Sequence, residues 1–191
     1  FEVARIAFTK VIELKPKDFQ PYLSRALSYL QLGKFTEASA DLDKVFELNP
    51  KLPDLYFYRG LLAHKQKDVD KAIVEFGKAI ALNPKYEALD ARASLSFEKK
   101  QFAQAAQDYT KLLELKPTGD TLYYRGLSSF QAKNFEQAIA DMTTLIEANP
   151  KVVQPYLLRA AAYCSSGKKE LAKADEKKII ELGGKVETSC Q

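Results

Sequence analysis

The sequence predicts an all-α protein built from repeated helix pairs, and three observations support this. Proline recurs with spacings of 34, 34, 33 and 33 residues, at Pro16, Pro50, Pro84, Pro117 and Pro150. Each interval contains an arginine followed by glycine or alanine, with an acidic residue 16 positions further on. Apolar residues in each interval fall at helical spacing in two stretches. Self-similarity at this period is typical of stacked helical repeats.

Each repeat is expected to hold a first helix, helix A, and a second, helix B. In the first full repeat we expect helix A over residues 19–32 and helix B over residues 35–48. Asp18 is a candidate N-cap of helix A. Prolines also fall in first turns of helix A, where a missing N–H costs little; these are Pro21, Pro53 and Pro155. Asn-Pro pairs at 49–50, 83–84 and 149–150 are expected to end helix B, because the residue before proline avoids the α region.

The turn from helix A to helix B is expected to contain a left-handed residue. Gly33 and Gly167 fit this place, because glycine adopts a positive φ without steric cost. In the middle repeats the same place is held by Lys67, Lys100 and Lys133, so those turns must form with less help from the sequence.

Counted from the start of helix A, the repeat has a large residue at position 4, Gly or Ala at 8, Ala at 20 and Pro at 32. In the first repeat these are Tyr22, Ala26, Ala38 and Pro50. The pattern resembles the tetratricopeptide repeat, with five repeats in phase after a half-repeat. This resemblance implies a right-handed superhelical solenoid of eleven antiparallel helices.

The array is expected over residues 1–182. Its parts are a half-repeat helix B at 1–16 and repeats at 17–50, 51–84, 85–117, 118–150 and 151–184, followed by a mobile C-terminal tail at 185–191. Because the first segment reads as a helix B without its helix A, we expect the chain to be a fragment. In the last repeat, Lys169, Lys173 and Glu176 make the outer face polar, as a terminal repeat requires.

Position 7 departs from the family, which has a large apolar residue where this chain has arginine. We hypothesise that each arginine pairs with the acid 16 residues later, because a planar guanidinium can hold a carboxylate with two hydrogen bonds. The pairs would be Arg25 with Asp41, Arg59 with Glu75, Arg92 with Asp108, Arg125 with Asp141, and Arg159 with Asp175. The alternative is that these arginines bind an acidic partner.

Composition argues against several functional classes. The longest apolar runs are shorter than the roughly 20 residues of a membrane span, so none is expected. The formal net charge is +4, but the lysines are spread along the chain and do not form the basic stripe of a nucleic-acid reader. Cys164 and Cys190 lack metal-site spacing, so we expect neither a zinc site nor a disulfide framework, and we expect a reducing compartment such as the cytoplasm.

Catalytic residues are not evident in the sequence. The single histidine, His64, has no nucleophile at a telling spacing, and no phosphate-binding glycine loop or paired-carboxylate motif appears. We therefore expect no enzyme activity, no metal and no cofactor.

In the fold that the resemblance implies, the A helices line a concave groove through repeat positions 2, 5, 6, 9, 12 and 13. The predicted partner-binding residues are Leu23, Leu27, Phe57, Tyr58, Leu61, Phe97, Tyr123, Tyr124, Leu127, Phe130, Leu157 and Leu158, with the acids Glu87, Asp90 and Asp120. An apolar surface with a polar rim indicates an interaction site, and Tyr is a favoured anchor. For Phe57, Phe97 and Phe130, packing between helices is the competing interpretation.

The function predicted from these residues is a non-catalytic adaptor that binds a protein or peptide segment with apolar anchors and a basic flank. The alternative is a structural module that self-associates in a homo-oligomer. Family members that bind the acidic C-termini of heat-shock chaperones carry Lys, Asn and Arg at set groove positions. Here those places hold Leu23, Leu27, Tyr58, Glu87 and Ala91, so binding of such tails is not expected.

Overall fold

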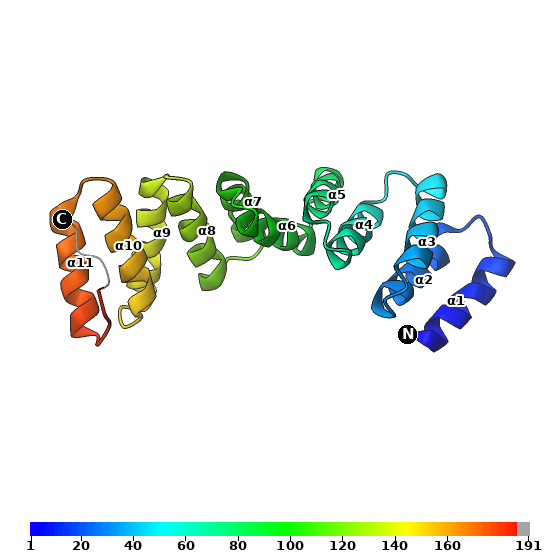
Figure 1. Cartoon of the computed structure of the whole chain (residues 1–191), viewed down its shortest axis with the longest axis horizontal. Helices are drawn as coiled ribbons and strands as arrows, with labels where there is room; N and C mark the ends of the chain where they lie inside the picture. The colour runs from blue at the N-terminus through cyan, green and yellow to red at the C-terminus, as the bar shows by residue number, and fades with distance from the viewer. Residues whose placement is uncertain (187–191) are drawn as a thin grey trace. The chain divides into compact units, whose positions relative to one another are not determined.

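A computed structural model describes residues 1–186 of the chain, and these residues form eleven α-helices and no strand, as the sequence predicts. The chain divides into two compact units, residues 1–95 and residues from 96 onward. Figure 1 labels the helices. They are α1 (Glu2–Leu14), α2 (Phe19–Gln31), α3 (Phe35–Leu48), α4 (Pro53–Lys65), α5 (Val69–Leu82), α6 (Tyr86–Glu98), α7 (Phe102–Leu115), α8 (Gly119–Gln131), α9 (Phe135–Ala148), α10 (Val153–Ser165) and α11 (Lys169–Glu181). The even-numbered helices are A helices and the odd-numbered ones are B helices.

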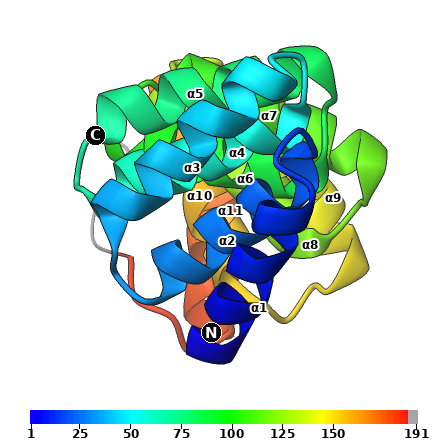
Figure 2. The ribbon, with the colours of Figure 1, turned by 90° about the vertical axis from the view of Figure 1, so that its right-hand side faces the viewer.

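In the first unit, neighbouring helices lie side by side: α1 packs on α2, α2 on α3, and α4 on α5 (Figures 1 and 2). The interior contains fully buried Leu42, Leu55 and Phe76. Ala26 of α2 and Ala38 of α3 are also fully buried, so the small residues at positions 8 and 20 lie inside the helix pair as expected.

The second unit repeats this arrangement, with α7 on α8, α8 on α9, α9 on α10 and α10 on α11. Leu112, Met142 and Ile179 are fully buried there. Val186, at the end of the described chain, packs against the cluster that contains Ile179. Of the predicted tail, residues 187–191 lie outside the described residues, as does Cys190. No helix among the described residues is long and apolar enough to cross a membrane.

A recurring tyrosine contact ties each repeat to the end of the one before it. The hydroxyl of Tyr22 donates to the carbonyl of Pro16 at 3.2 Å. The same bond joins Tyr56 to Pro50 at 2.7 Å and Tyr156 to Pro150 at 3.2 Å. The proline that stops helix B therefore also supplies the acceptor for the aromatic residue at position 4.

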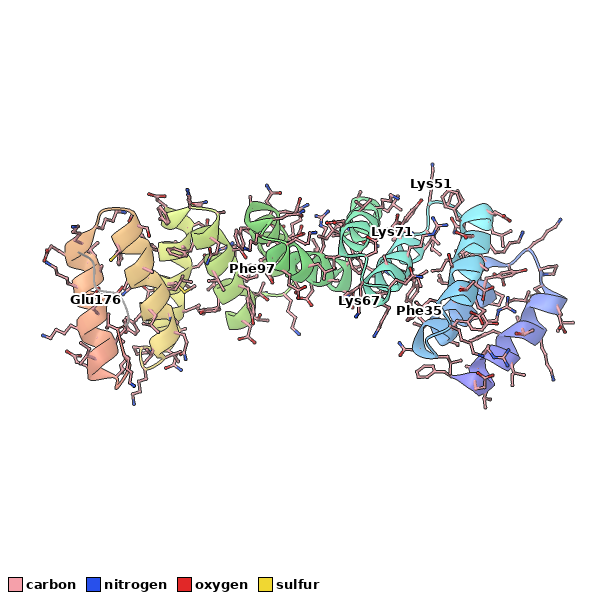
Figure 3. All side chains as sticks on the ribbon, in the orientation of Figure 1. Phe35, Lys51, Lys67, Lys71, Phe97 and Glu176 are labelled. Atoms are coloured by element: carbon pink, nitrogen blue, oxygen red, sulfur yellow. The ribbon has the colours of Figure 1, made fainter. Side chains whose placement is uncertain are left out.

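The turns from helix A to helix B adopt the left-handed backbone that the sequence predicts. Gly33 and Gly167 have φ of 71° and 77°. Lys67, Lys100 and Lys133 have φ of 65°, 60° and 64° at the equivalent places. A left-handed residue with a side chain is strained by about 1–2 kcal/mol, so these three lysines carry a local cost (Lys67 is labelled in Figure 3).

Three of the predicted arginine–acid pairs are present. Arg25 donates to Asp41 from Nε at 2.8 Å and from Nη2 at 2.7 Å. Arg159 makes the same two bonds to Asp175, at 2.8 and 2.7 Å, and Arg125 makes them to Asp141. Each pair joins helix A to helix B within one repeat.

The arginines also reach the preceding repeat. Nη1 of Arg25 donates to Oγ1 of Thr9 at 3.1 Å, and Nη1 of Arg159 donates to Oγ1 of Thr143 at 3.0 Å. Each threonine lies 16 residues before its arginine, just as each acid lies 16 residues after it. One side chain thus fixes both the helix pair and the contact between successive repeats.

The predicted pairing of Arg59 with Glu75 is wrong. Nη2 of Arg59 instead donates to Asp43 at 2.7 Å, and its guanidinium lies 4.9 Å from the ring centre of Phe46. The residue 16 positions before this arginine is an aspartate rather than a threonine, so two carboxylates compete for it. Glu75 is the longer acid and contacts Lys78. Arg92 and Asp108 fall in different units, and their pairing stays a prediction.

Candidate functional site

A cavity of about 500 Å³ lies in the first unit between α4, the end of α5 and the start of α6. Its lining residues are Pro53, Asp54, Phe57, Tyr58, Ala79, Asn83, Lys85, Glu87 and Ala88. Phe57, Tyr58 and Glu87 are among the predicted binding residues, and the structure brings them together on this one wall. Ligand sites are concave, mostly apolar and furnished with a few polar groups, which is how this cavity is lined.

The aromatic side of the cavity rests on the core. The ring of Phe57 meets Tyr58 edge-on with centroids 5.5 Å apart, and it also contacts Phe76 with centroids 5.7 Å apart. Phe76 is fully buried. Phe57 therefore packs between helices and lines the cavity at the same time, so the two interpretations of this residue hold together.

The polar side of the cavity contains one ion pair and one further acid. Nζ of Lys85 donates to Oδ1 of Asp54 at 2.7 Å, and this bond raises the pKa of Lys85. Burial, with a smaller contribution from Asp54, raises the pKa of the Tyr58 phenol. Glu87 is exposed. With Asp54 already paired, Glu87 leaves the cavity with an uncompensated negative charge.

The other predicted residues of the first unit are divided between surface and interior. Leu27 and Leu61 are half-buried, and Asp90 is exposed. Leu23 is buried, with 5% of its surface exposed, and belongs to the core cluster of α2, α3 and α4. We therefore leave Leu23 out of the candidate surface.

In the second unit, the predicted residues gather around stacked tyrosines. The rings of Tyr109 and Tyr124 stack with centroids 5.8 Å apart, and Tyr123 meets Tyr124 edge-on. Tyr124 and Leu157 are exposed by 47% and 39%.

Burial separates the remaining residues of this unit. Burial is also the main cause that raises the pKa of Tyr123. Asp120 is exposed, and Phe97, Leu127 and Phe130 are half-buried. Leu158 is buried, with 8% exposed, so it joins Leu23 as an interior residue.

Three lining residues were missed by the sequence analysis, which considered A helices only. Ala79 and Asn83 come from helix B of the second repeat, and Lys85 comes from the loop that follows it. The position of Lys85 directly after Asn83-Pro84 was the available signal, because the proline stop directs the following residue towards the next helix A.

The described residues show no arrangement suited to acid–base or metal chemistry. Among them, no group of three or more His, Cys, Asp or Glu side chains could hold a metal ion. His64 is exposed at the end of α4. What the geometry offers is concave apolar surface with a few charges, which suits recognition of another molecule.

A family model described as tetratricopeptide repeat matches residues 23–87 and 91–153. The chain belongs to this family. Such repeats generally form non-catalytic scaffolds for protein–protein interaction. No curated protein sequence matches the chain.

Solved structures share the fold at low sequence identity. YrrB, described as a TPR protein with an unusual peptide-binding site, is 20% identical, with a TM-score of 0.76 over 92% of each chain. The complex of Naa15/Naa10 bound to HypK-THB matches at 19% identity and a TM-score of 0.79, over 93% of this chain and 30% of that one. MamA from MSR-1 is 19% identical, with a TM-score of 0.65 over 86% of this chain and 96% of its own.

Proposed function

We propose that this chain is a scaffold that binds an extended segment of a partner protein, and that the α4–α6 cavity receives an apolar side chain of that segment. The observation that carries this proposal is the cavity itself, where Phe57 and Tyr58 form an apolar wall beside Asp54, Lys85 and Glu87. Aromatic side chains seated on a rigid core are effective interface anchors, because little conformational freedom remains for binding to remove.

The charges at the cavity favour a basic residue next to the apolar anchor. Glu87 is exposed beside the cavity, and Asp54 is shared with Lys85 over an exposed ion pair. A lysine or arginine of the partner would meet two carboxylates and one ammonium group. Complementary charge of this kind sets specificity and association rate more than affinity.

Self-association is the second candidate, and the exposed side of α1 favours it. Phe1, Val3 and Leu14 are exposed by 69%, 82% and 82%. Large exposed apolar side chains on one helix mark a surface that another chain can cover. Light scattering over a concentration series separates the two proposals, because a scaffold whose function is the cavity remains monomeric without its partner.

The test begins with selection of nine-residue peptides on the purified chain. Selected peptides should pair a large apolar residue with Lys or Arg. Calorimetry with the tightest peptide should then show at least tenfold weaker binding to Tyr58→Ala. Tyr124→Ala is the matched control, since it removes the same side chain from the other unit and should change the dissociation constant less than threefold.

The proposal would be abandoned if the selected peptides were acidic, or if Tyr58→Ala bound as tightly as the parent chain. Circular dichroism of both variants checks that neither loses helix. This control is needed because Tyr58 packs against Phe57, which contacts the core.

A further inference from the structure

A second cavity, of about 260 Å³, lies between α3, α4 and α5 and shares no residue with the first. Its polar lining consists of Asp43, Arg59, Gln66, Lys71 and Glu75. A water molecule occupies about 30 Å³ of liquid, so this space is larger than one or two waters need. The cavity is the place where the second repeat departs from the arginine–acid pattern of its neighbours.

Glu75 carries a buried oxygen that lacks a hydrogen-bond donor. The residue is 6% exposed, and its Oε1 accepts from Nζ of Lys78 at 2.7 Å. Its Oε2 is fully buried and has no partner among the described residues. Buried polar atoms are nearly always hydrogen-bonded, so an orphaned carboxylate oxygen beside a cavity indicates a missing donor.

The arginine that should supply this donor is engaged elsewhere. In the first, fourth and fifth repeats, the arginine gives two hydrogen bonds to the equivalent acid. Arg59 donates from Nη2 to Asp43 instead. This leaves its Nε and Nη1 groups for another acceptor, because a guanidinium has five N–H donors. The lining therefore offers one unused acceptor and unused donors.

The charges of the lining select a neutral ligand. Asp43 and Glu75 are balanced by Arg59 and Lys71, so the formal charge of the lining residues sums to zero. A carboxylate ligand would face the orphaned oxygen of Glu75, and a cation would face Arg59 and Lys71; both arrangements are repulsive. A neutral group that donates and accepts meets neither obstacle.

We propose that this cavity binds a primary carboxamide, the group at the end of an Asn or Gln side chain of a partner protein. Its NH2 donates to Oε2 of Glu75, and its carbonyl oxygen accepts from Arg59. A carboxamide has two donors and one acceptor oxygen, which matches what the lining lacks. This site is independent of the α4–α6 cavity and stands or falls without it.

The test uses three small probes of nearly equal size and different charge: acetamide, acetate and acetamidinium. Each is titrated into the 15N-labelled chain, and the Nε–H signal of Arg59 is followed by NMR. Acetamide should give a saturable shift with a dissociation constant at least fivefold lower than those of the two charged probes. Tighter binding of acetate or acetamidinium would overturn the assignment, and so would the absence of a saturable shift with acetamide.

Two variants address the geometry. Glu75→Leu removes the acceptor and should abolish the acetamide shift, whereas Glu87→Gln, in the other cavity, should leave it unchanged. Asp43→Asn should release Arg59 to bond Glu75 as in the other repeats, and acetamide binding should then weaken at least fivefold. A crystal structure of the parent chain with Arg59 already bonded to Glu75 would refute the proposal directly.

Discussion

Arg125 holds the carboxylate of Asp141 with two hydrogen bonds, from Nε at 2.9 Å and from Nη2 at 2.5 Å. The Asp141 side chain is 2% exposed and that of Arg125 is 19% exposed, so the aspartate is the more completely buried partner. Gln137 donates a third bond to the same carboxylate at 2.8 Å. These bonds raise the pKa of Arg125 above its ordinary value and keep the pair ionised at any pH at which the protein folds.

Breaking this pair should destabilise the fold strongly. Asp141→Ala leaves the Arg125 guanidinium largely buried without its acceptor, which costs about 3–5 kcal/mol. Urea unfolding of the two single variants and of the double variant with Arg125→Met gives the coupling energy.

The exposed pair Lys173–Glu170 is the control for that cycle, with side chains 57% and 85% exposed. Its coupling should be far smaller, because solvent screens exposed charges. Equal coupling in the two cycles would show that burial does not decide the strength of these pairs.

The sequence predicted the fold more completely than the site. Helix positions followed from proline punctuation and apolar spacing, so the first helix pair was placed within one residue at each end. The exchange of partners at Arg59 was not predictable from spacing alone. Asp43 and Glu75 both lie 16 residues from that arginine, and only packing decides between them.

The site was harder to predict because the face of a helix does not determine burial. Leu23 and Leu158 occupy groove positions in the repeat, yet both are buried in their units. Lys85 is at the cavity although it lies in a loop. Which residues bind a partner stays a prediction.

Gly60 should not tolerate a methyl group. A Cβ built at Gly60 would lie 2.6 Å from Cε1 of Phe76, a rigid ring in the core. Gly60→Ala should gain about 0.8–1 kcal/mol of helix propensity and lose about 1–3 kcal/mol through overpacking. The net loss should appear in chemical denaturation, and Phe76→Leu should restore most of it.

Gly126 provides the comparison. Its added Cβ would lie 2.5 Å from Cε of Met142, which is the end of a flexible side chain. Because that side chain can move aside, Gly126→Ala should be less destabilising than Gly60→Ala. The reverse order would mean that ring rigidity is not the deciding factor.

Replacing the left-handed lysines by glycine should stabilise the chain. Lys67 and Lys133 have φ of 65° and 64°, and both are exposed. Each change to Gly removes about 1 kcal/mol of strain, against a smaller loss from the added freedom of the unfolded chain. The midpoint of thermal unfolding should rise for each variant, whereas Gly33→Lys, at the same turn position, should lower it. A lower midpoint for Lys67→Gly would contradict this account.

Tyr58 should ionise later than an ordinary tyrosine when the pH rises. Its pKa is raised by burial first and by Asp54 second. A phenol whose pKa is higher in the folded chain stabilises the fold below the unfolded pKa of about 10, and this contribution is lost as the pH rises further. Absorbance titration of the parent minus Tyr58→Phe should give a midpoint above that value, and Asp54→Asn should lower it only slightly. A midpoint at or below about 10 would argue against a desolvated Tyr58.

The last prediction is that the α4–α6 cavity rejects acidic chain ends. A peptide that ends in Glu-Glu-Val-Asp would meet Asp54 and Glu87, while the single lysine there, Lys85, is already held by Asp54 at 2.7 Å. Charges that are desolvated without partners lose affinity, and like charges nearby add to the loss. Calorimetry should give a dissociation constant no lower than about 1 mM, equivalent to about −4 kcal/mol. Asp54→Asn frees Lys85 and should tighten this peptide severalfold, in a manner that salt weakens. Micromolar binding to the parent chain would show that acidic segments have a place on this surface which the charges of the cavity do not predict.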